Sequence, residues 1–459
     1  MSLFDATTLI VGSVIGSGIF VAPSLMAGLI ESPALHLALW LIGGLLTLAG
    51  ALAVAELSAA MPGSGGQYVF LRAAFGPATG FLFGWTYFFA INTGVAAAVS
   101  VAFGKHVGVF VPGIDEATVL AQLGGLRFTT AQVVAIGMLI VLTVLNVRGL
   151  RTGALVQNVF TIAKVAAIVL LVGLTLILGG RVAAAPSAPA SLLGPEGVKL
   201  GLFAALAVAM SKALFAYDAW YAAALAAEEV REPEKNLPRS LLLGTLGVTV
   251  VYLSAVGVYM WLVPAAEMAR VPDNRIGAYA AGRLLGARGE AFIAAAILIS
   301  TFGCANGLLL SGARVAYAMA RDGLFFAGIG AIHPEHRTPA NALWLQGAVG
   351  CALALTGSYS DLLTMTAFSS LLFNTLTVVG LFVLRRTRPE LPRPYRTWGY
   401  PVVPGFFVAV SAFFLVFILK GDPRNAGLGL ALTALGVPAY AWFERARRAE
   451  RSAPVESAS

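Results

Sequence analysis

The stretch Gly12-Ser13-Val14-Ile15-Gly16-Ser17-Gly18-Ile19-Phe20 places three glycines at the centre of the first long apolar run of the chain. A second long apolar run is interrupted at Leu214-Phe215-Ala216-Tyr217-Asp218-Ala219-Trp220, where an acidic residue occupies the midpoint. A helix that opens at bilayer depth exposes amide and carbonyl groups that lipid cannot satisfy, so such a break persists only where it lines a cavity or meets a ligand. One break in each half of the chain predicts a secondary transporter with a substrate site near the bilayer midplane.

The composition is that of a membrane protein. Of the 459 residues, 58% are hydrophobic and 11% are charged, and the mean hydropathy is +0.84. A soluble protein would carry about a quarter charged residues. The long apolar runs predict one membrane domain instead of several soluble ones. The net charge of +8 then concerns orientation in the lipid bilayer, and we expect no nucleic-acid partner.

The sequence offers little equipment for catalysis. It has four histidines and no cluster with metal-ligand spacing, which disfavours a membrane enzyme, and we expect neither a metal nor a cofactor. Cys304 and Cys351 both fall inside apolar runs, so no disulfide between loops is available. The first apolar run is too long for a cleavable signal peptide and lacks a basic segment before it, so we interpret it as a spanning helix.

Runs of about 17 to 25 apolar residues are long enough to cross a bilayer as helices. We find twelve such candidates, at 6–29, 34–60, 78–103, 130–146, 154–178, 200–227, 241–263, 291–319, 340–356, 362–384, 402–419 and 427–443. If both termini are cytoplasmic, 18 of the 30 Lys and Arg residues lie in inside segments, 10 in outside loops and two within helices. Because positive charge concentrates on the cytoplasmic side, this bias predicts cytoplasmic N- and C-termini.

The two breaks fall in the first and the sixth predicted helices. This spacing predicts an all-α membrane protein with two inverted five-helix halves followed by two further helices, in which the breaks meet at the centre. The predicted units are residues 1–180, residues 198–386, a helix pair at 400–445 and a cytoplasmic tail at 446–459. The tail is small and polar after Arg451, so we expect disorder there.

The first break can hold an anion. The amides of Gly16, Ser17 and Gly18 can turn inward at the positive end of a half-helix, which suits a carboxylate. Carbonyls left free near Val14 and Ile15 could accept from an ammonium group, so one break could bind both ends of an α-amino acid. Close packing of helices through these glycines is the alternative.

The second break offers a complementary set of groups. Carbonyls near Phe215 and Ala216 could complete the ammonium site, and the Phe215 ring could cover the substrate or act only as core. Asp218 is an intramembrane acid, so it is a functional-site candidate. It could lie beside the ammonium, titrate, or cap amides exposed at the break.

Two lysines also lie inside apolar runs. An unpaired ammonium at the depth of Lys164 would cost about 3 kcal/mol or more, so we expect it to be neutralised, deprotonated or hydrogen-bonded by carbonyls. It could hold the fifth helix against helices 1 and 8, with Ser300 or Thr301 as an acceptor, whereas snorkelling to the interface is the alternative. Lys212 lies one turn before Phe215 and could face an aqueous vestibule.

The order and spacing of several motifs resemble the amino acid–polyamine–organocation superfamily, especially its L-type amino acid transporter branch. The motifs are the first break quoted above, Ala55-Glu56-Leu57, Pro62-Gly63-Ser64-Gly65-Gly66-Gln67-Tyr68, Phe215 to Trp220, Glu228 to Arg239, Ala305-Asn306-Gly307 with Arg314, and Pro389 to Tyr395. The resemblance implies the twelve-helix fold of the bacterial leucine transporter, with alternating access.

The same resemblance implies a role for individual residues. The amides of Ser17 and Gly18 would bind the substrate carboxylate, the carbonyls of Val14 and Phe215 would take the ammonium, and the Phe215 ring would act as a gate. Lys164 falls on the family's fifth-helix lysine, which stands where sodium sits in sodium-coupled relatives, so transport would be sodium-independent.

The chain departs from the animal members of this family in two places. Asp218-Ala219 stands where they often have paired glycines, and no cysteine lies between Lys105 and Arg127, where they join a heavy subunit by a disulfide. We therefore expect no disulfide-linked partner.

These observations predict a carrier of amino acids in the plasma membrane that works as an exchanger or a proton-linked symporter. Neutral substrates are favoured, because beyond Asp218 no second acid is evident to meet a cationic side chain. A carrier of cationic amino acids or polyamines, and a membrane sensor that binds amino acids without moving them, are the alternatives.

Overall fold

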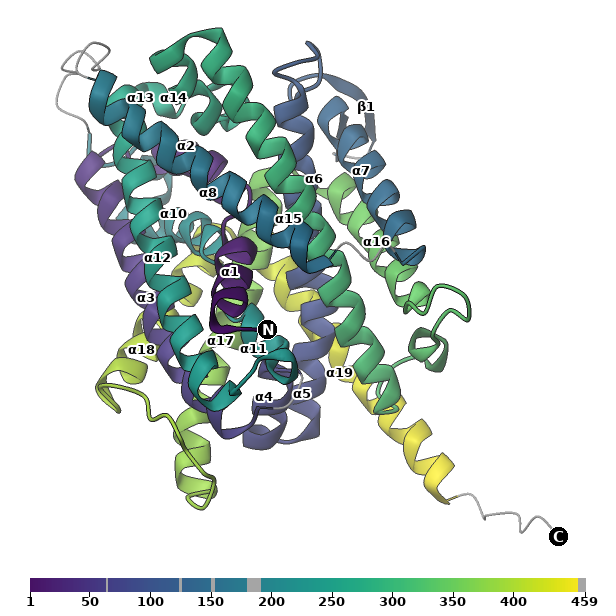
Figure 1. Cartoon of the computed structure of the whole chain (residues 1–459). Coiled ribbons are helices and arrows are strands. Elements are labelled where there is room, and N and C mark those ends of the chain that lie inside the picture. Colours follow the sequence, from purple (N-terminus) through teal and green to yellow (C-terminus); the bar gives the residue numbers. More distant parts are fainter. Residues whose placement is uncertain (63–64, 124–125, 150–152, 180–190, 453–459) are drawn as a thin grey trace.

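Long helices that run between two faces of the molecule make up nearly all of the computed structural model (Figure 1). The structure describes residues 1–62, 65–123, 126–149, 153–179 and 191–452, and all of their side chains except those of 123, 126, 153–160, 318 and 448–452. One face, which we call the hairpin face, carries α13, α14 and the strands β1 and β2 (Figure 1). The other, which we call the opposite face, carries α4 and the segment 388–401.

The elements follow in chain order. They are α1 (Leu3–Val14), α2 (Gly18–Leu29), α3 (Pro33–Ala60), α4 (Gln67–Phe75), α5 (Pro77–Thr86), the π-helix η1 (Tyr87–Asn92), α6 (Thr93–Val107), β1 (Val119–Leu123), β2 (Leu126–Thr129), α7 (Thr130–Val147), α8 (Gly153–Leu178), α9 (Pro195–Leu200), α10 (Leu202–Ala216), α11 (Ala222–Leu225), η3 (Ala227–Glu229), α12 (Pro233–Leu262), α13 (Ala265–Met268), η4 (Pro272–Asn274), α14 (Ile276–Leu285), α15 (Ala287–Arg321), η5 (Ala327–Gly330), α16 (Ala340–Thr356), α17 (Tyr359–Thr387), α18 (Val402–Gly421) and α19 (Pro423–Ser452).

Ten helical segments of the described chain are long and apolar enough to cross a membrane. The first of them is α1 and α2 together, and another runs continuously from α5 through η1 to the end of α6. Two shorter apolar helices, α10 with 15 residues and α16 with 17, occupy the remaining expected ranges at 200–227 and 340–356. The bundle is therefore that of a multi-pass membrane protein.

Two features differ from the expected all-α fold and its boundaries. The loop between α6 and α7 contains an antiparallel pair of strands, in which Val119 pairs with Thr129 and Leu123 with Leu126. Outside the apolar runs a segment can satisfy its backbone groups with a neighbouring strand as well as with its own helix. In addition, α19 continues to Ser452, so the first part of the expected tail at 446–459 is helical.

The rest of the expected tail lies outside the described residues, as do Gly63 and Ser64 of the motif from Pro62 to Tyr68.

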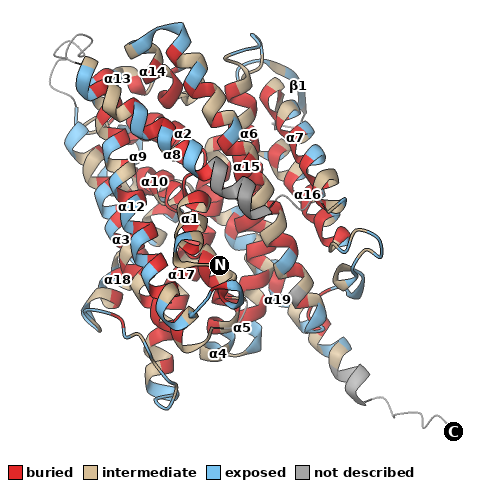
Figure 2. Cartoon of the chain, in the orientation of Figure 1, coloured by how far each residue is buried: buried red, intermediate tan, exposed pale blue. Residues whose placement is uncertain are grey.

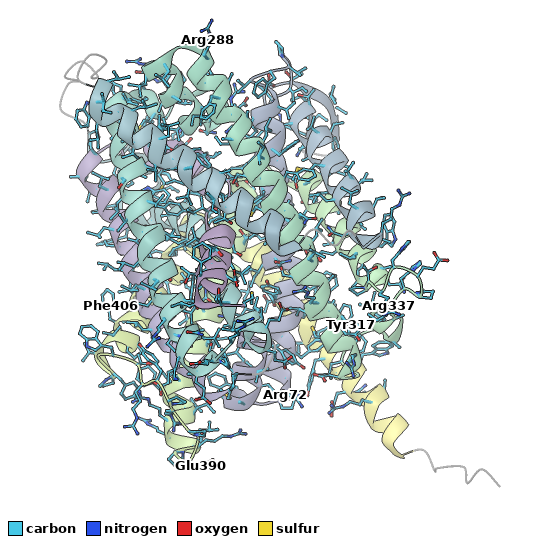
Figure 3. All side chains as sticks on the ribbon, viewed as in Figure 1. Arg72, Arg288, Tyr317, Arg337, Glu390 and Phe406 are labelled. Carbon is cyan, nitrogen blue, oxygen red and sulfur yellow. The ribbon has the colours of Figure 1, made fainter. Side chains whose placement is uncertain are left out.

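Burial separates the inside of the bundle from its flanks. Buried residues gather between the helices, whereas intermediate and exposed residues cover the outside (Figure 2). Many exposed side chains on the flanks are large and apolar, for example Leu176, Ile177 and Val250. Such a wide apolar surface is not stable against water and marks contact with membrane lipid. The long charged side chains Arg288 and Glu390 lie at the two ends of the molecule (Figure 3).

A buried carboxylate anchors the segment that follows α17 to α3. Glu56 accepts hydrogen bonds from Arg385 at 2.9 and 2.6 Å and from the Thr397 amide at 2.7 Å. Arg393 adds a further ion pair at 3.4 Å. These partners satisfy the lone pairs of a carboxylate that is almost fully buried, which is the condition for keeping a charge in such a place.

We expect Glu56→Gln to destabilise the protein by about 3 kcal/mol, because it leaves two arginines without their counter-charge. The loss will appear as a lower apparent unfolding temperature of the purified protein in detergent. Arg386→Gln, which changes the exposed neighbour of Arg385, is the matched control. Equal unfolding temperatures for the two variants would contradict this role of Glu56.

Candidate functional site

The first break lies where the sequence predicts it. The helix α1 ends at Val14, residues Ile15 to Ser17 leave the helical path, and α2 begins at Gly18. The Gly16 amide donates to the Val14 carbonyl at 2.8 Å, which turns the chain sharply. Glycine accepts such a turn at little steric cost.

The second break is longer. The helix α10 ends at Ala216, the chain turns through residues 217–221, and a single helical turn, α11, begins at Ala222. Ala219 has a φ of 64°, in the left-handed region that favours glycine. The resemblance to the animal members implies glycine at this position, which the backbone conformation also favours, and this chain carries alanine there at a cost of about 1 kcal/mol.

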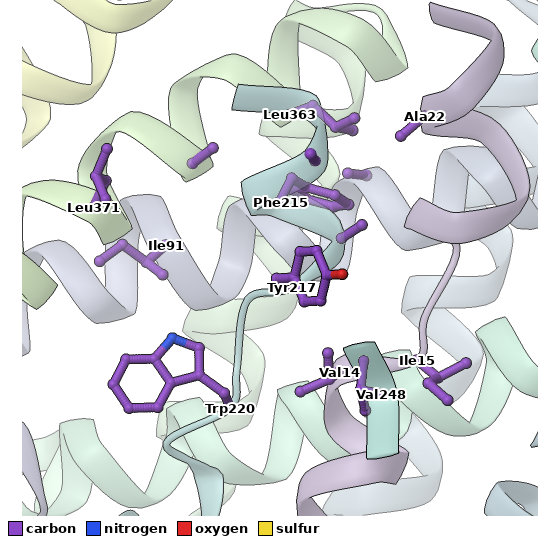
Figure 4. Close-up of a cluster of buried hydrophobic side chains, with 14 of the residues drawn as sticks. Val14, Ile15, Ala22, Ile91, Phe215, Tyr217, Trp220, Val248, Leu363 and Leu371 are labelled. Atoms are coloured by element: carbon purple, nitrogen blue, oxygen red, sulfur yellow. The ribbon is translucent and has the colours of Figure 1, made fainter. Parts of the chain in front are cut away.

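The two breaks touch each other. A Cβ atom on Gly18 would lie 2.7 Å from the Cα atom of Ala216, so only glycine allows this approach of the two backbones. Figure 4 shows Val14 and Ile15 at the end of α1 beside Phe215 and Tyr217 at the end of α10. Segments 200 residues apart in the chain thus form one centre, as the sequence predicts.

The hydroxyl of Tyr252, on α12, joins the ends of both broken helices. It lies 2.9 Å from the Val14 carbonyl oxygen and 2.9 Å from the Ala216 carbonyl oxygen. Both carbonyls belong to the last turn of a half-helix, where no intrahelical donor remains. A single buried hydroxyl, which has one hydrogen to donate, therefore lies within bonding distance of a carbonyl from each opened helix.

Lys164 on α8 satisfies a third such carbonyl. Its ammonium group donates to the Gly12 carbonyl oxygen at 2.5 Å, and the side chain is buried. Gly12 lies in the last turn of α1, where the partial negative charge of the helix end favours a cation. A carbonyl holds this lysine, as expected, and the buried side chain does not snorkel to the interface.

The expected pairing of Lys164 with Ser300 or Thr301 does not form. The Thr301 hydroxyl donates to the Ile297 carbonyl of its own helix at 2.7 Å, and the Ser300 hydroxyl has no hydrogen-bond partner among the described residues. A threonine inside a helix readily bonds the carbonyl one turn back. The end of α1 offers Lys164 a stronger acceptor than these hydroxyls.

The amides and the carbonyls of the predicted site differ in the hydrogen bonds that they already make. Among the described residues, the amides of Ser17, Gly18 and Ile19 have no hydrogen-bond partner at the start of α2. The Val14 carbonyl, expected to be free, accepts from both Gly16 and Tyr252, because the turn at Gly16 directs an amide toward it. The Phe215 carbonyl accepts one bond, from the Asp218 amide at 3.2 Å. The centre therefore has spare donors for an anion and fewer spare acceptors for a cation.

Aromatic residues close the centre toward the hairpin face. The Phe215 ring packs edge-on against the Tyr359 ring, with centroids 6.2 Å apart. The Tyr359 hydroxyl lies 2.9 Å from the Ser17 hydroxyl at the first break. Tyr359 is the first residue of α17, so the start of this helix lies directly over both breaks.

Asp218 turns toward α17. The Ser370 hydroxyl donates to its carboxylate at 2.7 Å, Asn374 donates to the Ser370 oxygen at 3.3 Å, and Gln67 donates to the Asn374 oxygen at 2.6 Å. Every donor in this chain points toward the carboxylate, an arrangement in which the hydrogen bonds polarise one another. A cavity of about 20 Å³, room for about one water molecule, adjoins Asp218, Trp220 and Ser370.

Lys212 does not face a vestibule as expected. Its ammonium group is buried and donates to the Ser360 carbonyl at 2.8 Å, the Ser360 hydroxyl at 2.9 Å and the Thr364 hydroxyl at 2.7 Å. The packing of α10 against α17 removes the water that a lysine beside an open vestibule would have. Lys212 instead ties α10 to the first turns of α17.

Sequence reasoning missed Tyr252, Tyr359 and Ser370. A tyrosine in an apolar helix carries a hydroxyl that needs a partner when it is buried, so Tyr252, inside the predicted span 241–263, carried a signal, whereas Tyr359 lies before the predicted span 362–384. The sequence does not say which tyrosine meets a broken helix.

Comparison of the sequence with a family model and with individual proteins relates the chain to known proteins. The family model described as amino acid permease matches residues 1–437. The serine/threonine exchanger SteT of Bacillus subtilis is 31% identical over 443 residues, which cover 96% of this chain and 95% of the exchanger. The large neutral amino acids transporter small subunit 2 of Homo sapiens is 31% identical, covering 96% of this chain and 79% of that protein. The b(0,+)-type amino acid transporter 1 of Mus musculus is 29% identical, covering 92% and 83%.

We expect Tyr252→Phe to lower the stability of the protein by about 1–3 kcal/mol, because it leaves the buried Ala216 carbonyl without a donor and removes one of the two donors to the Val14 carbonyl. Thermal unfolding of the purified protein in detergent will measure the loss. Tyr259→Phe is the matched control, because that hydroxyl is buried on the same helix and has no partner among the described residues. If the two variants unfold alike, Tyr252 does not support the breaks.

Proposed function

The chain belongs to the amino acid permease family, and from this premise we propose that it is a sodium-independent secondary transporter that exchanges amino acids by alternating access. One observation carries the proposal: the amides of Ser17, Gly18 and Ile19 have no partner among the described residues, and Gly18 lies against Ala216 at the second break. Three unbonded amides at the start of a helix are the arrangement that binds a carboxylate.

The substrate's carboxylate is assigned to the amides of Ser17 and Gly18, at the positive end of α2. Its ammonium is assigned to the Phe215 carbonyl, which accepts one bond and has a second lone pair. The Val14 carbonyl also accepts from the ammonium when the Tyr252 hydroxyl donates to the Ala216 carbonyl instead. The hydroxyl lies 2.9 Å from each of the two carbonyl oxygens. Residues 14–18 and 215–218 thus frame an α-amino acid, and the Phe215 ring covers it.

Lys164 supports the assignment of sodium independence. Its ammonium is a fixed cation bonded to the last turn of α1 at 2.5 Å. A cation there neutralises the end of the half-helix and holds α8 against α1 without a bound metal ion.

Twelve crossings follow if α10 with α11 and α16 also span the membrane. The two halves, 1–180 and 198–386, are then inverted repeats with the pair α18 and α19 added, which places both termini in the cytoplasm of a cell-membrane protein. We assign no disulfide-linked heavy subunit, because the segment between Lys105 and Arg127 contains no cysteine. We assign no enzymatic activity.

Neutral L-amino acids are the favoured substrates. The carboxylate of Asp218 is bonded by Ser370 and turned toward α17, so it is engaged away from the first break. A cationic amino acid or a polyamine would need this acid to leave Ser370. A sensor that binds amino acids without moving them is the alternative from another class.

Counterflow in proteoliposomes tests the transport proposal. We expect radiolabelled L-serine and L-leucine to enter at least about tenfold faster, equivalent to about 1.4 kcal/mol, when vesicles contain an unlabelled neutral amino acid than when they are empty. Replacing sodium by potassium and removing the pH gradient will leave the rates unchanged.

The other readings predict different results in the same assay. Faster entry of L-arginine than of the neutral amino acids would favour the cationic alternative, and dependence on a pH gradient would favour proton coupling. Binding of L-leucine to the detergent-purified protein without any accumulation would indicate a sensor.

We expect Lys164→Ala to reduce exchange at least about tenfold while expression stays near wild type, because α1 loses the cation that satisfies its last turn. Lys199→Ala, which removes an exposed lysine, is the control. Exchange at the wild-type rate in Lys164→Ala would remove the role assigned to this residue.

A further inference from the structure

The loop after α6 places one carboxylate between two elements of the hairpin face. Glu116 accepts from the Lys105 ammonium at 2.7 Å with one oxygen and from the Tyr359 amide at 3.0 Å with the other. Lys105 lies in the last turn of α6, and Tyr359 is the first residue of α17. We call Lys105, Glu116 and Tyr359 the Glu116 cluster.

Each contact in the cluster is of a strong kind. The Lys105 side chain is 1% exposed and that of Glu116 is 24% exposed, so water screens this ion pair little. The carboxylate also meets the first amide of α17, where the helix end carries partial positive charge. The Lys105 ammonium lies 5.2 Å from the centre of the Tyr359 ring, within range of a cation–π contact.

A third element joins the cluster from the other half of the chain. The Glu116 amide donates to the Asp273 carboxylate at 3.3 Å, and Arg275 donates to the Lys105 carbonyl at 3.0 Å. Asp273 and Arg275 themselves lie 3.8 Å apart as an ion pair. The loop that carries Glu116 therefore connects α6, α17 and the segment before α14.

The cluster acts directly on the residues that close the substrate site. Tyr359, whose amide Glu116 holds, bonds Ser17 through its hydroxyl and packs against Phe215. All three contacts belong to Tyr359, the first residue of α17. Displacing Tyr359 would therefore free the Phe215 ring to move and uncover the first break at the same time.

The opposite face also carries a buried ion pair, that of Glu56 and Arg385, but it anchors the segment after α17 to α3 and does not hold the start of α17. On the same face Glu229, the last residue of η3, and Arg314 in α15 are 3.7 Å apart with side chains 58% and 68% exposed. Exposed pairs at such distances contribute little. The two sides of the site are therefore closed by interactions of different strength.

We propose that Glu116 is a positioning residue of the outer gate, which holds Tyr359 over Ser17 and Phe215 and must release Lys105 before a substrate can enter from outside. The inference rests on the proposed alternating access, in which the hairpin face is the outer side. A carboxylate on a loop, distant from the substrate, would then control how fast the outer gate opens.

A native cysteine provides the test. The Cys304 sulfur lies 3.4 Å from the position that a Cβ atom on Gly16 would occupy, so its exposure reports opening at the first break. In a Cys351→Ala background, a membrane-impermeant sulfonated maleimide will be added to the outside of right-side-out vesicles. We expect Glu116→Gln to be labelled about tenfold faster than the parent, a factor that corresponds to about 1.4 kcal/mol.

The control variants distinguish loss of the Glu116 cluster from a general loosening of the fold. Glu267→Gln removes another carboxylate of the hairpin face, paired with Arg283 at 3.0 Å and remote from α17, and should label at the parental rate. Lys105→Met should label faster as Glu116→Gln does, and the double variant should gain little more, because both changes break one interaction. Cys304→Ala should not be labelled.

Equal labelling of Glu116→Gln and the parent, or equal acceleration in Glu267→Gln, would overturn the proposal. If Glu116→Gln does not fold, Lys105→Met alone decides by the same comparison. Labelling needs no substrate, so its result is independent of whether the wild type exchanges amino acids in counterflow. A wild type that exchanges while Glu116→Gln labels normally would leave the proposed function intact and reject the gate residue.

Discussion

Main-chain groups that helices release at bilayer depth have to find partners inside the protein, and this constraint organises the centre of the molecule. Two helices end there, α1 at Val14 and α10 at Ala216. Their last carbonyls accept from Lys164 and from the Tyr252 hydroxyl, which belong to α8 and α12. The packing of four helices around the breaks is therefore set by hydrogen bonds as much as by apolar contact.

The partners are distributed unevenly, and the asymmetry has chemical meaning. Among the described residues, the carbonyls of Gly12, Val14 and Ala216 at the ends of α1 and α10 are bonded, whereas the amides at the start of α2 are not. A site with unpaired donors attracts an anionic group, and the negative ends of two half-helices nearby favour a positive one. A zwitterion satisfies both requirements within one small space.

A single helix, α17, contacts several parts of the candidate site. Its first residue closes the breaks through Ser17 and Phe215, and its next turn holds Lys212. Further along, Ser370 holds Asp218, and at the far end Arg385 pairs with Glu56. Because these contacts lie on one rigid element, a shift at its start would be felt at both breaks, whereas the buried ion pair at its other end resists movement.

Much of this could be predicted from the sequence, because it depends on local composition. Apolar run lengths locate the spanning helices, the glycines of the first break and Asp218 mark where two helices open, and the central position of Lys164 requires a hydrogen-bonding partner. Only the tertiary structure decided which residues are the hydrogen-bond partners. Lys164 bonds Gly12 and neither Ser300 nor Thr301. Asp218 accepts from Ser370, and Tyr252 serves both broken helices. A sequence shows that a buried polar group must be satisfied, but the donor that satisfies it comes from a helix whose position is fixed only when the whole bundle packs.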